Sequence, residues 1–239
     1  AQDNIYVADA SNNVVRKITP AGVVSTFAGA GTAGSADGAA TTATFNSLTD
    51  MAITPAGVMY VADQVNHVIR KIENGQVTTI AGLAGTLGNV NGTGSAARFN
   101  QPSWVTLAPD GTLLIRDGAN SGNIRKLDPA TGVVTSFAAG TASLYSGVGV
   151  DSSGLAYAAL TANTITLISD FDQVNLVGTG TAGSVVGLNT AATIADPREM
   201  VFAPNGNIYF PSLAQNNIRT GTPIPSLANP GKQIGRAHV

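Results

Sequence analysis

Three aspartate–arginine pairs recur at regular intervals, and a carboxylate facing a guanidinium could bind a charged substrate or relay a proton. A pair that is copied from one repeat to the next serves the repeat more readily than a single catalytic centre. Each pair brackets a short polar loop between two apolar runs, so its members can meet across two strands. The sequence therefore predicts three structural clamps, Asp9 with Arg16, Asp63 with Arg70, and Asp117 with Arg125.

Two other carboxylates, Asp50 and Glu199, are expected at the starts of innermost strands in two different repeats. Carboxylate and amide oxygens are the ligands that Ca²⁺ and Mg²⁺ prefer. Two carboxylates are few ligands for a divalent cation. Both positions also suit a solvated junction between loop and strand. We predict no cofactor, with a Ca²⁺ or Mg²⁺ ion at these two residues as the alternative.

Histidine and cysteine give little scope for nucleophilic catalysis. The chain has no cysteine and two histidines, and the second, His238, lies in a tail that carries no functional argument. His67 falls in a short loop whose sister positions are Asn13, Ser121 and Thr164. No Ser/His/Asp or Cys/His set can be assembled. We expect His67 to be a surface residue of its loop.

Two glycine-rich stretches, Gly29–Gly34 and Gly178–Gly183, match the spacing G-x-G-x-x-G. A dinucleotide site needs a helix directly after this motif, so that the helix N-terminus faces the pyrophosphate. The residues that follow have no helical pattern. We reject the nucleotide interpretation.

These residues recur because the chain itself repeats. Ile5–Ile18, Met59–Ile72 and Leu113–Leu127 are near-copies, and weaker copies span residues 154–168 and 207–219. Each copy has two β-branched, apolar runs around a polar loop, a pattern that indicates a β-hairpin. Turns such as Thr54-Pro-Ala-Gly57 delimit two further strands in each complete unit.

Four-stranded antiparallel units repeated in a row predict an all-β fold, a β-propeller. Long connections at residues 29–46, 82–101 and 178–197 are expected to emerge on one face, called here the loop-rich face. The first unit lacks its innermost strand, and both ends of the sequence look truncated. Residues 222–239 form a tail, of which 234–239 matches a translated sequencing adapter. We predict one propeller domain over residues 1–221, with five units at 1–28, 48–81, 102–139, 145–177 and 198–221.

The repeated pattern resembles the NHL repeat. The likeness rests on N-I-Y-V-A-D and V-R-K-I in the hairpins, then A-G-x-G, D-G and A-x-F-N in the connections. Domains of that family usually have six blades, so the resemblance implies a six-bladed parent. Similar propellers of the gluconolactonase type hold a divalent cation near the channel mouth, and the lyases of this fold depend on histidines.

The composition of the chain limits the classes of partner that it is expected to bind. Charged residues make up 11% and the net charge is −2, so nothing favours binding to nucleic acid. No apolar run approaches the ~18 residues that cross a bilayer, and we expect no membrane insertion. The Thr-, Ala- and Gly-rich, Lys-poor composition suits an exported bacterial protein, extracellular or periplasmic.

The leading hypothesis is a non-enzymatic binding or scaffold propeller that engages a protein or a glycan through the loop-rich face. A metal-dependent hydrolase or lactonase is one alternative, and a structural subunit of an extracellular assembly is another. Incomplete end units would leave strand edges unpaired, so we also expect self-association. The residues expected on the binding face are Asp37, Asn66, His67, Asn91, Trp104 and Arg198.

Overall fold

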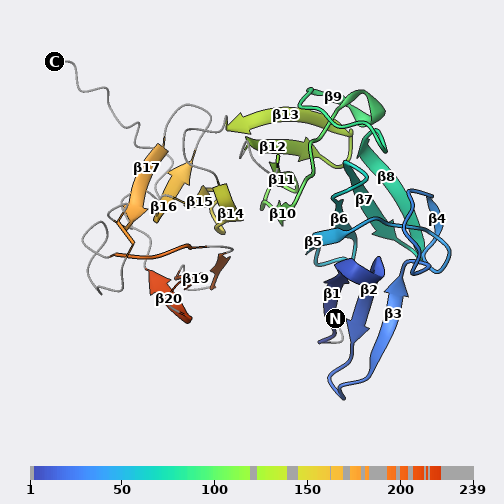
Figure 1. Cartoon of the computed structure of the whole chain (residues 1–239), viewed down its shortest axis with the longest axis horizontal. Coiled ribbons are helices and arrows are strands. Elements are labelled where there is room, and N and C mark those ends of the chain that lie inside the picture. The colour runs from blue at the N-terminus through green and yellow to red at the C-terminus, as the bar shows by residue number, and fades with distance from the viewer. Residues whose placement is uncertain are drawn as a thin grey trace.

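A computed structural model of the chain describes residues 3–118, 123–138, 145–161, 163–168, 173–178, 181–182, 193–197, 200–203, 207–212, 214 and 216–221. Five antiparallel sheets follow one another along the chain and are arranged in an arc (Figure 1). No α-helix is found in the described parts; two short 3-10 turns lie at Ala10–Asn12 and Gly94–Ala96. The predicted all-β propeller with five repeat units is confirmed.

Each unit is a meander in which consecutive strands pair. The first unit contains β1 (Ile5–Asp9), β2 (Val14–Ile18) and β3 (Val24–Ala28). The second contains β5 (Leu48–Ile53), β6 (Met59–Asp63), β7 (Val68–Glu73) and β8 (Gln76–Gly82). The third contains β10 (Trp104–Leu107), β11 (Leu113–Asp117), β12 (Asn123–Asp128) and β13 (Val133–Ala138).

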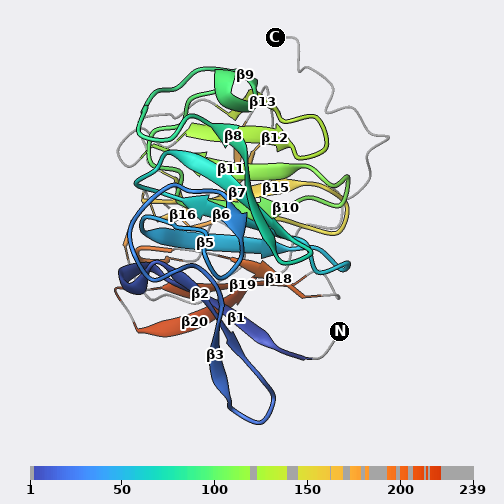
Figure 2. The ribbon, with the colours of Figure 1, turned by 90° about the vertical axis from the view of Figure 1, so that its right-hand side faces the viewer.

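The last two units continue the same order. The fourth contains β14 (Tyr145–Val150), β15 (Ala156–Leu160), β16 (Thr164–Ile168) and β17 (Gln173–Val177). The fifth contains β18 (Val201–Phe202), β19 (Ile208–Ser212) and β20 (Asn217–Gly221). Figure 2 shows the sheets from the side, with the hairpin of β2 and β3 projecting beyond the others.

Two of the long connections add a strand that the sequence did not predict. β4 (Gly38–Ala39) pairs with β8, and β9 (Gly92–Thr93) pairs with β13, so these two sheets have five strands rather than four. Each connection therefore passes along the outer edge of the next sheet before the chain enters its innermost strand. The loops are part of the blades, and they cover edges that would otherwise be unpaired.

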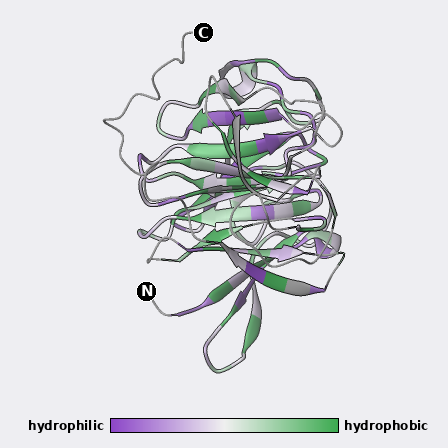
Figure 3. Cartoon of the chain, turned by 90° about the vertical axis from the view of Figure 1, so that its left-hand side faces the viewer, coloured by the Kyte–Doolittle hydropathy of each residue, from purple (hydrophilic) through white to green (hydrophobic). Residues whose placement is uncertain are grey.

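Alternation along the strands builds the core between neighbouring sheets (Figure 3). In β6, Met59 and Val61 pack toward the first unit, whereas Tyr60 and Ala62 pack toward the third. A period of two is what a strand buried on both faces requires. Each interior sheet is thus held by its two neighbours, and the core is a series of layers between blades.

The two ends of the arc are open. No strand of the first unit pairs with a strand of the fifth in the described parts of the chain. The outward faces of these units carry apolar side chains, with Ile5 62% exposed on β1 and Ile218 78% exposed on β20. The equivalent faces of interior sheets are buried against a neighbour.

Candidate functional site

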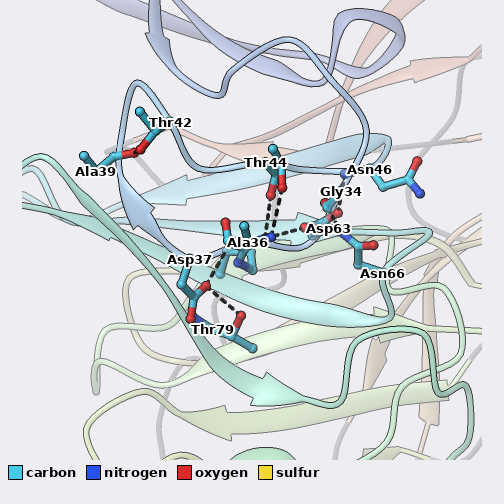
Figure 4. A network of polar contacts seen from close by, with 11 residues as sticks. Gly34, Ala36, Asp37, Ala39, Thr42, Thr44, Asn46, Asp63, Asn66 and Thr79 are labelled. Carbon is cyan, nitrogen blue, oxygen red and sulfur yellow. Dashed lines mark hydrogen bonds and ion pairs between the residues drawn. The ribbon is translucent and has the colours of Figure 1, made fainter.

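The second unit shows what the aspartate–arginine pair does. Asp63 ends β6 and Arg70 lies on β7, and their side chains are fully buried with Nη1 and Oδ2 2.8 Å apart. Asp63 Oδ2 also accepts a bond from Nδ2 of Asn66 at 2.8 Å, and Oδ1 accepts one from the backbone N–H of Asn46 at 2.8 Å. Figure 4 shows these groups converging with the connection that precedes β5.

Arg70 fastens that connection to the sheet. Its guanidinium donates to the carbonyl oxygens of Thr44 and Ala36, each at 3.0 Å, and to Oδ1 of Asp37 at 2.8 Å. The ring of Phe45 lies 5.1 Å from the guanidinium carbon. Asp37 in turn accepts bonds from the N–H and hydroxyl of Thr79 on β8. One buried arginine thus holds three points of a loop that is remote in sequence.

The third unit repeats this arrangement with equivalent donors and acceptors. Asp117 and Arg125 are buried and 3.0 Å apart, and Asp117 Oδ1 accepts from the N–H of Asn100 at 2.6 Å. Arg125 donates to the carbonyl oxygens of Arg98 and Val90 and to Oδ1 of Asn91, and the Phe99 ring lies 5.4 Å from its guanidinium carbon. Asn91 occupies the place that Asp37 has in the second unit.

The first unit has the pair without the loop. Asp9 and Arg16 are 3.0 Å apart and partly exposed, and Asn12 donates to both oxygens of Asp9. The hydrogen bonds from Asn12 and Arg16 lower the pKa of Asp9. Burial, the largest influence, instead raises the pKa of Asp63 and of Asp117. The pKa of the aspartate is therefore lowered where the pair is exposed and raised where a loop buries it.

The residues expected on the binding face, apart from His67, divide into three groups. Asp37, Asn66 and Asn91 use their side chains to anchor loops, as described above. Trp104 is half-buried at the start of β10, with the guanidinium carbon of Arg116 5.2 Å from its ring. Arg198 lies outside the described residues, as does the predicted metal ligand Glu199. The polar side chains of the loop-rich face therefore mainly hold its own loops in place.

Asp50, the other predicted metal ligand, lies on β5 beside the third unit. Its Oδ2 accepts a hydrogen bond from the N–H of Val105 on β10 at 2.9 Å. This bond joins two adjacent innermost strands. Within the described residues no group of three or more His, Cys, Asp or Glu side chains is placed to hold a metal ion.

His67, expected to be a surface residue, is buried. Its φ is +60°, and its Nδ1 accepts a hydrogen bond at 3.1 Å from the N–H of Gln101, just before the next unit. Oδ1 of Asn13 accepts from Ser47 in the same way, and Oδ1 of Asn163 accepts from Asp196. His67 therefore replaces an asparagine in a chain of bonds that joins successive blades.

This equivalence also corrects the sequence alignment of the fourth unit. The sister of His67 there is Asn163, with φ +61°, and not Thr164, which begins β16. The loop after Leu160 is one residue shorter than the loop after Asp63, so counting from the end of the preceding strand misplaced the position by one. The left-handed backbone explains why asparagine is preferred there.

We predict that His67→Asn removes an acid sensitivity of the fold. Burial lowers the pKa of His67, so below about pH 6.5 the unfolded chain takes up a proton that the folded chain resists. Stability is therefore complete above that pH and is lost as the pH falls below it. Protonation at Nδ1 would also cost the bond from Gln101, worth about 1 kcal/mol.

The measurement is the midpoint of thermal unfolding at pH 5 and at pH 7 for both proteins. The gap between the variant and the parent should widen in favour of the variant at pH 5. His238 is present in both proteins, so its titration cancels. A gap that is the same at both pH values would show that His67 does not titrate in the fold.

The glycine-rich motif also has a structural role. Gly29, the first glycine of one motif, follows β3 with φ +105°, and Gly82, which ends β8 outside either motif, has φ +95°. A Cβ at these positions would lie 2.6 and 2.5 Å from the carbonyl oxygens of Asn13 and His67. Gly178, the first glycine of the other motif, makes the same approach in the fourth unit. A glycine at this position lets the chain pass close to the neighbouring hairpin loop.

A pocket of about 630 Å³ lies on the face opposite the loop-rich face. It is formed where the turns after four successive innermost strands, β5, β10, β14 and β18, come together. We call it the inner-turn pocket. Its lining residues are Thr54, Pro55, Tyr60, Leu107, Ala108, Pro109, Gly111, Val150, Asp151, Ser152, Phe202 and Ala203.

Asp151 is the one ionisable acid among these residues. Its Oδ1 accepts bonds from the N–H and hydroxyl of Ser153 and from the N–H of Leu155, and its Oδ2 accepts from the Tyr157 hydroxyl at 2.9 Å. Burial, reinforced by this bond to a carboxylate, raises the pKa of Tyr157. Tyr157 therefore stays protonated and acts as a fixed donor.

A second hollow of about 450 Å³, called here the side pocket, adjoins the first between the third and fourth units. The two share Ala108 and Pro109. The side pocket contains an exposed ion pair in which Lys126 Nζ lies 3.3 Å from Oδ2 of Asp110. Both pockets are lined by the short turns between strands.

Sequence reasoning missed the two pockets and the aromatic partners of the arginines. Each turn gives the inner-turn pocket only two to four residues, and none of them is distinctive alone. A signal did exist for Phe45 and Phe99. Both belong to the repeated A-x-F-N pattern, whose asparagine supplies the N–H that Asp63 or Asp117 binds.

Comparisons with known proteins agree with this architecture. No protein-family profile matches the sequence, and no curated protein sequence matches it either. Among solved structures, virginiamycin B lyase of Staphylococcus aureus is 14% identical with a TM-score of 0.59. The alignment covers 92% of this chain and 66% of the lyase. The likeness shows the fold alone.

Two further structures are similar. An auxiliary nutrient binding protein of Bacteroides ovatus is 16% identical with a TM-score of 0.67, over 93% of this chain and 52% of that protein. A gluconolactonase of Xanthomonas campestris is 15% identical with a TM-score of 0.59, over 94% of this chain and 73% of that enzyme. The propeller fold is thus shared by a lyase, a lactonase and a binding protein, and it does not choose among these functions.

The described parts of the chain contain no helix that is long and apolar enough to cross a membrane.

Proposed function

We propose that this chain is a non-enzymatic binding propeller, of the NHL type, that holds part of a protein or glycan partner in the inner-turn pocket. The observation that carries the proposal is the pocket itself, formed by four successive blades at one end of their innermost strands. Its volume of about 630 Å³ lies within the ~300–1,000 Å³ typical of ligand sites. Its lining is mainly apolar, with a few polar groups.

The choice of face follows from how the polar groups are used. On the loop-rich face, the side chains of Asp37, Asn66, His67 and Asn91 are engaged in holding loops and joining blades. On the opposite face the turns are short, and they enclose a hollow. Sites on rigid, pre-formed elements lose less entropy when a ligand binds. An extracellular or periplasmic location suits the composition and a role in binding.

The first test uses 2-phenylethanol as a probe for an apolar group of the partner. Ligand-observed NMR on the 239-residue chain should detect binding, and Ala203→Trp, which fills the pocket, should abolish it. Val133→Trp, a change at an exposed position on β13 outside the pocket lining, is the matched control and should leave binding intact. Binding that survives Ala203→Trp would place the probe elsewhere and contradict the proposal.

The metal-dependent hydrolase gives a separate prediction. For a binding propeller we expect no stoichiometric Ca²⁺ or Mg²⁺ site at Asp50 and Glu199. One oxygen of Asp50 already accepts the N–H of Val105, which leaves less of the carboxylate for a cation. Calorimetric titration should show no micromolar binding. Binding that disappears in Glu199→Gln would favour the hydrolase instead.

Self-association is the remaining expectation. β1 and β20 each present an edge without a partner strand in the described parts of the chain, and Ile5 and Ile218 are exposed beside these edges. Light scattering should show a mass that rises with concentration, and Ile218→Lys should reduce the rise. Val133→Lys, on a strand paired on both sides, should not. A monomer at every concentration would contradict this prediction.

A further inference from the structure

We propose that the inner-turn pocket selects a primary amine carried on an apolar or aromatic body, with the ammonium group against Asp151. This inference rests on the proposed binding function and specifies the ligand class. It follows from a carboxylate that its turn does not need, from the lack of a basic partner for that carboxylate among the described residues, and from the apolar lining that surrounds it.

The turn at Asp151 requires an acceptor and not a charge. In the second unit the hydroxyl of Thr54 accepts the N–H of Val58 at 3.0 Å, which is the bond that Oδ1 of Asp151 makes to Leu155. The third and fifth units have Ala108 and Ala203 at this position, and the N–H of each still donates to the carbonyl oxygen four residues further on. The negative charge of Asp151 is therefore a departure from the repeat.

That charge is not neutralised by the groups that donate to it. The donors to Asp151 are neutral, namely the backbone, the Ser153 hydroxyl and the Tyr157 hydroxyl. In the described parts of the chain no basic side chain forms an ion pair with it. Asp110, on the rim of the side pocket, differs because Lys126 lies 3.3 Å away. Two acids lie on neighbouring turns, and one of them is already neutralised.

The rest of the pocket suits a hydrophobic body. Tyr60, Leu107 and Phe202 form part of its wall, with Pro55 and Pro109 at the turns, and the described lining residues include no lysine or arginine. A cation is attracted both to the carboxylate and to aromatic faces, whereas an anion would be repelled by the carboxylate. The pocket therefore discriminates by charge as well as by shape.

Three probes of one shape test this charge preference on the full chain: 2-phenylethylamine, 2-phenylethanol and 3-phenylpropionate. At pH 7 and low salt the amine should bind about tenfold more tightly than the alcohol, and the acid more weakly than either. Added salt should reduce the advantage of the amine. Equal binding of amine and alcohol would overturn the amine inference while leaving the pocket as a binding site. Binding of none of the three would overturn both.

Two matched variants locate the charge. Asp151→Asn keeps an oxygen for the turn and should bring the amine down to the affinity of the alcohol. Asp110→Asn removes the neutralised acid and should leave the tenfold preference unchanged. Unfolding midpoints report whether each variant is folded, and the three-probe comparison on the parent chain stands if one is not. A preference for the amine that persists in folded Asp151→Asn would overturn the inference.

Discussion

Asp63→Ala should destabilise the chain by about 3 kcal/mol or more, which lowers the midpoint of thermal unfolding by roughly 6–12 °C. The variant removes the one fully buried carboxylate partner of Arg70 and leaves that guanidinium paired only with Asp37, whose side chain is half-exposed. It also removes the acceptor for Asn66 and for the N–H of Asn46. Breaking a fully buried ion pair is among the most costly changes to a fold. The connection ahead of β5 loses its bond at Asn46 at the same time.

Asp37→Ala is the matched control because Asp37 also contacts Arg70, at 2.8 Å, but its side chain is 47% exposed. Water can replace that carboxylate, and Arg70 keeps Asp63, so we expect a loss of about 1 kcal/mol or less. Thermal unfolding at pH 7 compares the two variants with the parent. Equal midpoints for both would mean that Asp63 is no more important to the fold than an exposed loop acid.

The strands were predictable from the sequence because their signals are local. β6 and β7 begin and end where alternation and the flanking turns place them, since each turn residue acts within four positions of itself. The pairing of Asp63 with Arg70 was also within reach, because a hairpin brings the two positions together. Repetition made both inferences stronger, as the same pattern recurs in three units.

The loops and the pocket were not predictable, because their contacts span long distances along the chain. Arg70 binds Ala36, 34 residues earlier, and a strand as short as β4 has no periodicity to detect. From the sequence, His67 looked like a variable loop residue. Its bond to Gln101 shows that it has the same role as Asn13 and Asn163. The inner-turn pocket exists only when four blades are placed around one axis.

The second large effect is expected for Gly82→Ala, at about 3 kcal/mol, or roughly 6–12 °C in the unfolding midpoint. Gly82 has φ +95°, where an L-residue costs about 1–2 kcal/mol. The added Cβ would lie 2.5 Å from the carbonyl oxygen of His67 and 3.0 Å from Cα of Val68. Backbone rather than a flexible side chain opposes it, so crowding adds about 1–3 kcal/mol.

Gly75→Ala separates the two contributions. Gly75 has φ +72°, also in the left-handed region, but an added methyl group there would meet no atom within 4 Å. It should therefore cost about 1–2 kcal/mol from the backbone alone. Denaturant unfolding of the two variants gives both values. If Gly82→Ala and Gly75→Ala cost the same, the close approach of the outer strand to the neighbouring hairpin loop contributes nothing, and glycine is required at position 82 only for its backbone angle.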